Sequence, residues 1–183
     1  VTICALPIYH IFGFNTNMML GMRMGGCNIL IANPRDFSGV LKELSQQRFH
    51  SFPAVNTLFN ALVNHPDFDK VDWSSLKISV AGGMAVQQAT ARLWLDKTGC
   101  PICEGYGLSE TSPSVSCNPV DSTTYSGNIG LPMPSTELKL LDDDGIEVPL
   151  GTPGEIAIRG PQVMAELNAA RAGGELAAMA GED

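Results

Sequence analysis

Four short apolar segments that alternate with longer periodic segments constrain the fold of this chain more than any other feature. The apolar segments are rich in Val, Ile and Leu, are bounded by Pro, Gly or Asn, and cover residues 2–6, 28–32, 51–55 and 77–81. Such segments are typical of buried strands in a parallel sheet. Helical spacing of apolar residues predicts helices over residues 36–44, 56–64 and 86–98, with Asp36 as an N-cap. This order predicts an α/β fold, a mainly parallel sheet with flanking helices.

The second half of the chain has a different composition and a different hydrophobic pattern. Residues 105–135 are crowded with Gly, Pro, Ser and Thr, and they predict a long loop with a functional role. Residues 137–141 alternate like a strand, an Asp-Gly step at 144–145 predicts a hairpin turn, and residues 146–149 would return as the second strand. Another strand is expected over residues 154–160. The α/β layer is therefore followed by a small antiparallel β element.

These patterns divide the chain into three parts. Residues 1–125 form the α/β part of one domain, residues 126–163 a β-rich subdomain of the same domain, and residues 164–183 a divergent low-complexity tail rich in Ala. The chain begins at Val1 without a signal-like leader, so we expect it to be an internal piece of a longer protein.

Composition and charge exclude several classes of protein. A chain of 183 residues with 44% hydrophobic and 16% charged residues can bury a core, which excludes disorder for most of its length. A formal net charge of −8 provides no cationic field for a nucleic-acid partner. No apolar run approaches the roughly 20 residues of a bilayer-spanning helix. We therefore expect a cytoplasmic protein.

The five cysteines are irregularly spaced, as expected for reduced thiols in a chain that folds without disulfides. Cys100 and Cys103 form a C-x-x-C motif, but the sequence has no second pair and no histidine set for zinc. We do not expect a redox or metal role for this motif.

The strongest chemical signal is the segment over residues 104–113, which reads EGYGLSETSP. Its glycines let the backbone approach a ligand closely, and Tyr106 can lie against a purine face. Ser109 can donate to a phosphate oxygen, and Glu110 can hold a hard cation such as Mg²⁺. The alternative is an ordinary Gly/Ser loop with a solvated glutamate, which composition alone favours.

Two further motifs lie at strand ends. Residues 82–85, GGMA, follow the strand expected over 77–81, and open α/β sheets bind ligands at the carboxyl ends of their strands. A tight turn that needs glycine is the alternative for this motif, which is neither a Walker loop nor a dinucleotide fingerprint. His10 lies at a strand-to-helix junction, where a lone histidine more often packs or caps than catalyses.

The order and spacing of the motifs resemble those of a known family. LPxxHxxG at 6–13, GGMA at 82–85, GYGLSE at 105–110, GLP at 130–132 and GEIxIRG at 154–160 closely resemble the adenylate-forming superfamily of acyl-CoA synthetases, nonribosomal-peptide adenylation domains and luciferases. Residues 33–36, 55–62 and 160–164 are similar in particular to bacterial long-chain fatty-acid:CoA ligases. The resemblance runs from residue 1 to about residue 164, and it implies part of the large N-terminal AMP-binding domain of that fold.

The resemblance also implies roles for individual residues. Tyr106 would stack near the adenine, and the nucleotide-binding residues would be Gly82, Gly83, Met84, Ala85, Glu104, Gly105, Tyr106, Gly107 and Ser109. Ser109 and Glu110 would be catalytic, since the Ser109 hydroxyl, usually Thr in this motif, would meet the α-phosphate and Glu110 would be the Mg²⁺ ligand. The acyl pocket would include His10, Met84 and Gly130.

The function implied is that of an ATP-dependent long-chain fatty acid:CoA ligase. In such enzymes the fatty-acid carboxylate attacks the α-phosphate of ATP to give acyl adenylate and pyrophosphate, and the thiol of CoA then displaces AMP. ATP or AMP, Mg²⁺ and CoA are the implied cofactors and co-substrates, and the parent enzyme would make peripheral contact with the inner face of the membrane.

Several family features are not found in this sequence, among them the phosphate loop with its Lys and the Thr-Gly-Asp motif. We therefore expect the isolated chain to be catalytically inactive. Two alternatives stay open, namely another adenylate-forming ligase that uses a medium-chain or aryl acid, and a non-catalytic nucleotide-binding relic.

Overall fold

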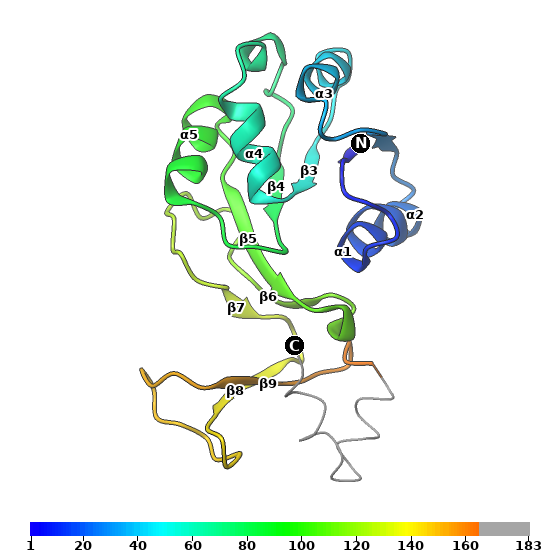
Figure 1. The fold of residues 1–183 in the computed structure, drawn as a ribbon. Coiled ribbons are helices and arrows are strands. Elements are labelled where there is room, and N and C mark those ends of the chain that lie inside the picture. Colours follow the sequence, from blue (N-terminus) through cyan, green and yellow to red (C-terminus); the bar gives the residue numbers. More distant parts are fainter. Residues whose placement is uncertain (165–183) are drawn as a thin grey trace.

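A seven-stranded sheet forms the centre of the computed structural model, which describes residues 1–164 (Figure 1). The order of its strands is β2-β1-β3-β4-β5-β6-β7. Their bounds are β1 (Thr2–Cys4), β2 (Asn28–Leu30), β3 (Ser51–Ala54), β4 (Ile78–Ala81), β5 (Ile102–Gly107), β6 (Ser114–Cys117) and β7 (Leu131–Pro132). Neighbouring strands from β2 to β5 are parallel, and β6 and β7 continue the sheet antiparallel. The predicted α/β class with a mainly parallel sheet is confirmed.

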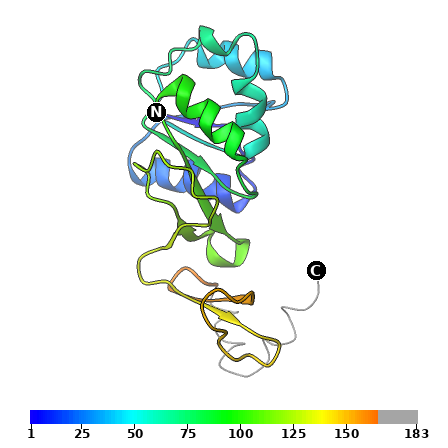
Figure 2. The ribbon, with the colours of Figure 1, turned by 90° about the vertical axis from the view of Figure 1, so that its left-hand side faces the viewer.

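Helical segments connect the parallel strands. They are α1 (Ile11–Gly13), the π-helical η1 (Phe14–Met19), α2 (Leu20–Arg23), α3 (Phe37–Leu44), α4 (Asn56–Val63), the short 3₁₀ turn η2 (Phe68–Lys70), α5 (Gln88–Thr98) and the 3₁₀ turn η3 (Ser109–Thr111). Figures 1 and 2 show α1 and α2 apart from α3, α4 and α5, with strands between the two groups. Within residues 1–164, no helix is both long and apolar enough to cross a bilayer.

The helix ends follow from local chemistry. Asp36 caps α3, because its Oδ1 accepts a hydrogen bond from the Gly39 N–H at 3.0 Å. A different helix, α5, ends at its C-terminus with Gly99, which adopts a left-handed φ of 71°, as is common at helix C-termini. The predicted cap at Asp36 is confirmed.

Aromatic rings fill the core between the sheet and helices α4 and α5. The Trp94 indole is fully buried, with ring centroids 4.7 Å from Phe59 and 5.0 Å from Trp73. Its Nε1–H donates to the Ser79 Oγ of β4 at 3.0 Å, so the buried nitrogen has a partner. This packing ties α5 to the strands whose ends carry the candidate site.

The small antiparallel element differs from its prediction. Strand β8 (Glu137–Leu141) pairs with β9 (Glu155–Arg159), and the expected return over 146–149 after the Asp-Gly turn is confirmed only in part. That segment forms a short bridge between Leu141 and Glu147, and the Val148 N–H donates to the Leu140 carbonyl at 2.9 Å. Leu141 pairs with both Glu147 and Glu155, so the two segments lie on opposite edges of β8; Pro149, which lacks an N–H, ends the shorter pairing.

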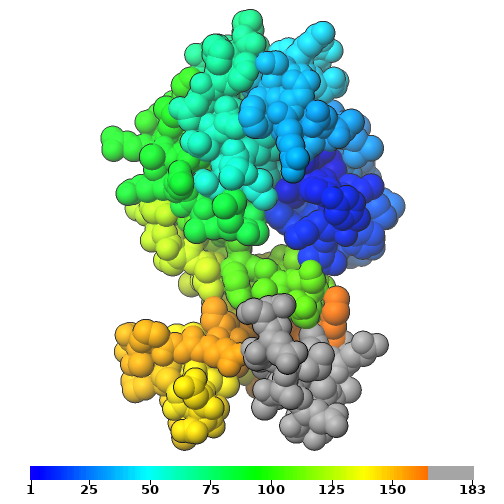
Figure 3. Space-filling view, viewed as in Figure 1, coloured from blue at the N-terminus to red at the C-terminus, as the bar shows by residue number. Residues whose placement is uncertain are grey.

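The predicted loop over residues 105–135 is also only partly a loop. It contains η3, β6 and β7, which are two to four residues long and therefore too short to show a period in the sequence. Beyond it, the β8–β9 hairpin lies at one end of the molecule (Figure 3). The segment after β9 contacts the region after β5, because the Met164 N–H donates to the Glu110 carbonyl at 2.9 Å. The expected tail lies outside the described residues, apart from Met164.

Candidate active site

Three segments that follow β1, β4 and β5 meet at one edge of the sheet. A Cβ added at Gly82, after β4, would lie 3.1 Å from the Phe12 ring of α1 and 3.6 Å from the Gly105 carbonyl of β5. The Asn15 side-chain amide donates to the Ser112 carbonyl, which joins η1 to the loop after β5. The carboxyl ends of parallel strands form this edge, where open α/β sheets bind ligands.

The loop after β5 presents Ser109 and Glu110 to solvent. Gly107 makes this loop possible, because any Cβ at that position would overlap the Pro113 carbonyl. The Thr111 Oγ1 donates to the Pro113 carbonyl at 2.7 Å, and the Leu108 N–H lies 3.0 Å from the same Thr111 oxygen. The buried Thr111 therefore holds the exposed Ser109 and Glu110 in place.

Glu104 positions the segment that follows β4. Its Oε1 accepts a hydrogen bond from the Val86 N–H at 3.0 Å, and the Tyr125 hydroxyl donates to the Val86 carbonyl at 2.8 Å. The Asn56 Oδ1 accepts from the next backbone amide, that of Gln87, at 3.1 Å. The start of α5 and the preceding GGMA segment are thus held against β5 and α4.

Several of these positioning residues were missed by the sequence analysis. Val86, Asn56 and Tyr125 fix the site through contacts between distant segments, which no local pattern marks, and Thr111 does so within its own loop. Thr111 is different, since it lies inside the EGYGLSETSP segment and its hydroxyl at a turn is a recognisable capping signal.

The remaining predicted site residues occupy different surroundings. Met84 and Ala85 are exposed beside the strand ends, and Tyr106 is half-buried in β5. His10 is exposed, and its Nδ1 accepts from the Phe12 N–H at 3.2 Å, so in this structure it caps α1. Gly130 lies directly before β7, against the backbone of Cys117 and Asn118 in and after β6, and Cys117 in turn pairs with Gly105 of β5.

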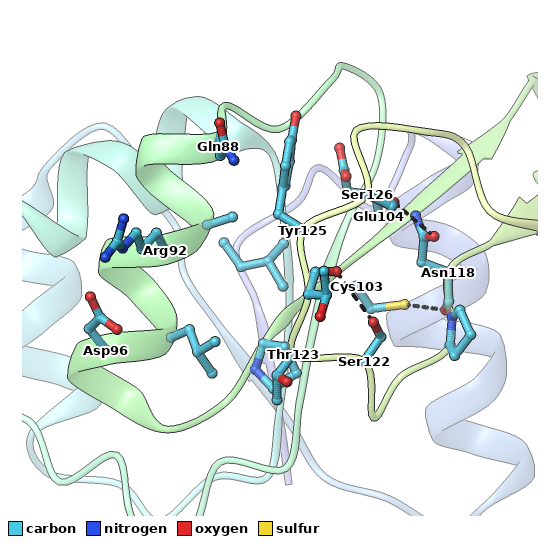
Figure 4. Close-up of a pocket in the computed structure, with 16 residues that line it drawn as sticks. Gln88, Arg92, Asp96, Cys103, Glu104, Asn118, Ser122, Thr123, Tyr125 and Ser126 are labelled. Atoms are coloured by element: carbon cyan, nitrogen blue, oxygen red, sulfur yellow. Dashed lines mark hydrogen bonds between the residues drawn. The ribbon is translucent and has the colours of Figure 1, made fainter.

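A cavity of about 400 Å³ lies on the other side of Glu104, between α5, β5 and the loop over 118–126 (Figure 4). Arg92 and Asp96 line it from α5, Cys103 and Glu104 from β5, and Tyr125 from the loop. Of these residues only Glu104 was predicted as a site residue, because the wall is assembled from three separate segments of the chain.

The donor set at Glu110 fits Mg²⁺ better than a metal with several protein ligands. Within residues 1–164, no three His, Cys, Asp or Glu side chains gather into a metal-binding group. Mg²⁺ is commonly held by one or two carboxylates, substrate phosphates and water, which a single exposed carboxylate beside a hydroxyl can provide for.

Comparisons with known proteins agree with this arrangement. The family model described as AMP-binding enzyme matches residues 1–167. Long-chain-fatty-acid–CoA ligases of Escherichia coli O6:H1 and Haemophilus influenzae are 53% identical over 164 residues and 48% over 162 residues. The alignments cover 90% and 88% of this chain but only 29% of each relative.

Solved structures show the same fold. The anthranilate CoA ligase AuaEII in complex with anthranoyl-AMP has a TM-score of 0.82 and 28% identity, covering 88% of this chain and 31% of that structure. A benzoate CoA ligase from Burkholderia xenovorans has a TM-score of 0.82 and 23% identity, covering 90% of this chain and 33% of that structure. At this level of identity it supports the fold alone.

Proposed function

The chain belongs to the AMP-binding enzyme family, and on that premise we propose that it is the central part of an ATP-dependent long-chain fatty acid:CoA ligase. The observation that carries the proposal is the meeting of three segments at one sheet edge, with Ser109 and Glu110 exposed on a loop held by Thr111. The chain spans 29% of the length of the relatives from E. coli and H. influenzae, so the other parts of the active site belong to sequence outside it.

The nucleotide would lie along the ends of β4 and β5. The half-buried Tyr106 ring offers a face for the adenine, and the glycines around it let backbone and ligand approach closely. Glu104 holds the GGMA segment beside that face through the Val86 amide. Gly82, Gly83, Met84 and Ala85 would form the adjoining wall.

Charge on the phosphates would be met by Ser109 and Glu110. The Ser109 hydroxyl can donate to an α-phosphate oxygen, and the Glu110 carboxylate would hold Mg²⁺. When bound, Mg²⁺ neutralises negative charge on the phosphate oxygens. Both residues would act by being held at fixed positions near the phosphates. The hydrogen bond from Thr111 to the Pro113 carbonyl, which holds their loop, would therefore support catalysis.

The acid and CoA are the other proposed substrates. His10 and Met84 would edge the acyl pocket, in which a fatty-acid carboxylate is placed to attack the α-phosphate. Gly130 would belong to the part of the same pocket that lies next to β6, since it packs on the β6 backbone. CoA would then displace AMP to form the thioester, and peripheral contact of the parent enzyme with a membrane stays a prediction from its apolar substrate.

The two alternatives differ from this proposal in measurable ways. The fold is shared with an anthranilate ligase, so architecture does not set the acid, and a medium-chain or aryl acid is one alternative. A non-catalytic nucleotide-binding relic is the other. Sequence identity of 48–53% to ligases of long-chain fatty acids favours a long-chain acid.

A chimera tests the proposal. Residues 1–164 would replace the matching segment of the E. coli relative, which supplies the parts of the ligase outside this chain. We expect the chimera to catalyse ATP–pyrophosphate exchange that depends on oleate, with much less exchange on octanoate and none on benzoate. The unmodified relative is the matched control. A folded chimera that prefers benzoate or octanoate would support the first alternative, and one without exchange would support the relic.

A further inference from the structure

The cysteine contacts differ from the pairing that the C-x-x-C motif suggests. The Cys100 Sγ accepts a hydrogen bond from the Ser79 Oγ at 3.5 Å in the core. Cys103 instead meets Cys117, with 3.1 Å between the two sulfur atoms. We call Cys103 and Cys117 the thiol pair; both are free thiols in the structure.

The pairing of β5 with β6 holds the thiol pair together. Gly105 lies opposite Cys117 in the antiparallel register, and the Asn118 N–H donates to the Glu104 carbonyl at 2.9 Å. A Cβ added at Gly105 would lie 3.7 Å from the Cys117 sulfur. Because Gly105 has no side chain, the Cys117 side chain has room to extend across the strand pair to Cys103.

The surroundings of the two thiols favour reaction between them. The Cys103 Sγ lies 2.8 Å from the Asn118 carbonyl oxygen and 3.1 Å from the Cys117 Sγ, so its one proton can be donated to either of them (Figure 4). The hydrogen bond between the two sulfurs lowers the pKa of the Cys117 thiol, and the same contact, together with burial, raises the pKa of Cys103. Cys117 is therefore the sulfur that ionises first, and the thiolate is the reactive form.

The thiol pair lies beside a cavity that small molecules can enter. Cys103 lines the cavity of about 400 Å³ that Glu104 and the 118–126 loop enclose, and Cys117 is only half-buried. The buried Cys100 does not line this cavity. A hydroperoxide is small enough to enter a space of this volume.

We propose that the thiol pair is an oxidation site, at which a hydroperoxide converts Cys103 and Cys117 into an intramolecular disulfide. The Cys117 thiolate attacks one peroxide oxygen, an S–O bond forms as the O–O bond breaks, and the departing oxygen takes up a proton from water and leaves as alcohol or water, so sulfur is oxidised and the peroxide is reduced. The Cys103 sulfur then attacks the Cys117 sulfenic sulfur, the S–O bond breaks, and water leaves with the Cys103 proton. The sulfurs need to approach by only about 1 Å to reach bonding distance. The proposal does not depend on the ligase activity.

Peptide mapping of the 183-residue chain tests it, in a Cys27→Ser background that removes the exposed thiol. Combined digestion with trypsin and Glu-C separates residues 98–104, which contain Cys100 and Cys103, from residues 111–137, which contain Cys117. After treatment with hydrogen peroxide and blocking of free thiols, we expect these two peptides as one disulfide-linked species that a reductant separates.

Three matched variants assign the bond. Cys100→Ser should keep the linked species, and Cys103→Ser should lose it and leave Cys117 as a sulfenic acid that dimedone traps. Cys117→Ser should also lose it. The proposal is overturned if Cys100→Ser abolishes the link, or if Cys103 and Cys117 stay alkylatable at peroxide doses that oxidise Cys27 in the unmodified chain. Linking that is as fast in urea as in the folded chain would also contradict it.

Discussion

Replacing Gly107 by alanine is expected to reduce oleate-dependent exchange of the chimera by about a hundred-fold or more, because a misplacement of 1 Å can have that effect on catalysis. The added Cβ would overlap the Pro113 carbonyl, which is backbone and has no rotamer to adopt. The loop must therefore shift, and Ser109 and Glu110 shift with it. Pyrophosphate exchange measures the loss, and thermal unfolding followed by circular dichroism reports whether the fold survives.

Gly26→Ala is the matched control for this prediction. The nearest atom to an added Cβ at Gly26 is the Gly21 carbonyl oxygen at 3.5 Å, an ordinary contact outside the candidate site. We expect this variant to exchange like the unchanged chimera. Equal exchange by the Gly107 and Gly26 variants would show that the loop after β5 does not position reacting groups.

Trp94→Ala should have the largest effect on stability. The indole is fully buried, packs on Phe59 and Trp73, and donates to Ser79, so its removal leaves a cavity and removes the hydrogen bond that the Ser79 oxygen accepts. Truncation of such a side chain costs about 3–5 kcal/mol of unfolding free energy. Urea unfolding of the chain, followed by circular dichroism, measures the change.

Two further variants keep that result interpretable if the alanine variant does not fold. Trp94→Phe retains a ring but loses the hydrogen bond, so it should lie between the alanine variant and the unchanged chain. Leu150→Ala changes a fully exposed side chain and should alter the unfolding free energy by less than about 0.5 kcal/mol. A Trp94→Ala variant as stable as Leu150→Ala would refute the assigned core.

The α/β layer could be predicted because its signals are local. Strands β1 to β4 are short apolar runs, and α3 to α5 have helical spacing with recognisable ends such as Asp36 and Gly99. The partner of β8 could not be predicted in the same way. The turn signal at Asp144–Gly145 does bring residues 146–148 back along β8, but the longer pairing is with β9, which lies beyond that turn and which no local signal identifies as the partner.

The candidate site divides along a similar line. The residues predicted to touch a nucleotide lie within contiguous motifs, and the structure brings the GGMA and GYGLSE segments together at one edge. Glu104 and Thr111, which help to hold them in place, lie in the EGYGLSETSP segment, but Asn56 and Tyr125 lie outside every motif. The contact of Tyr125 with Val86 spans 39 positions, and the thiol pair joins two strands whose pairing depends on the β5–β6 register.

The magnesium dependence of a Glu110→Gln chimera tests the central claim most directly. Glutamine keeps the size of the side chain but removes its charge, and the backbone bond from Met164 to the Glu110 carbonyl is unaffected. Glu147→Gln in the β8–β9 hairpin, which removes an exposed carboxylate paired with Lys139, is the control. We predict that Glu110→Gln lowers oleate-dependent exchange by about a hundred-fold or more and raises the Mg²⁺ concentration required, as expected for loss of charge stabilisation at the phosphates. Exchange equal to that of Glu147→Gln at every Mg²⁺ concentration would contradict the account.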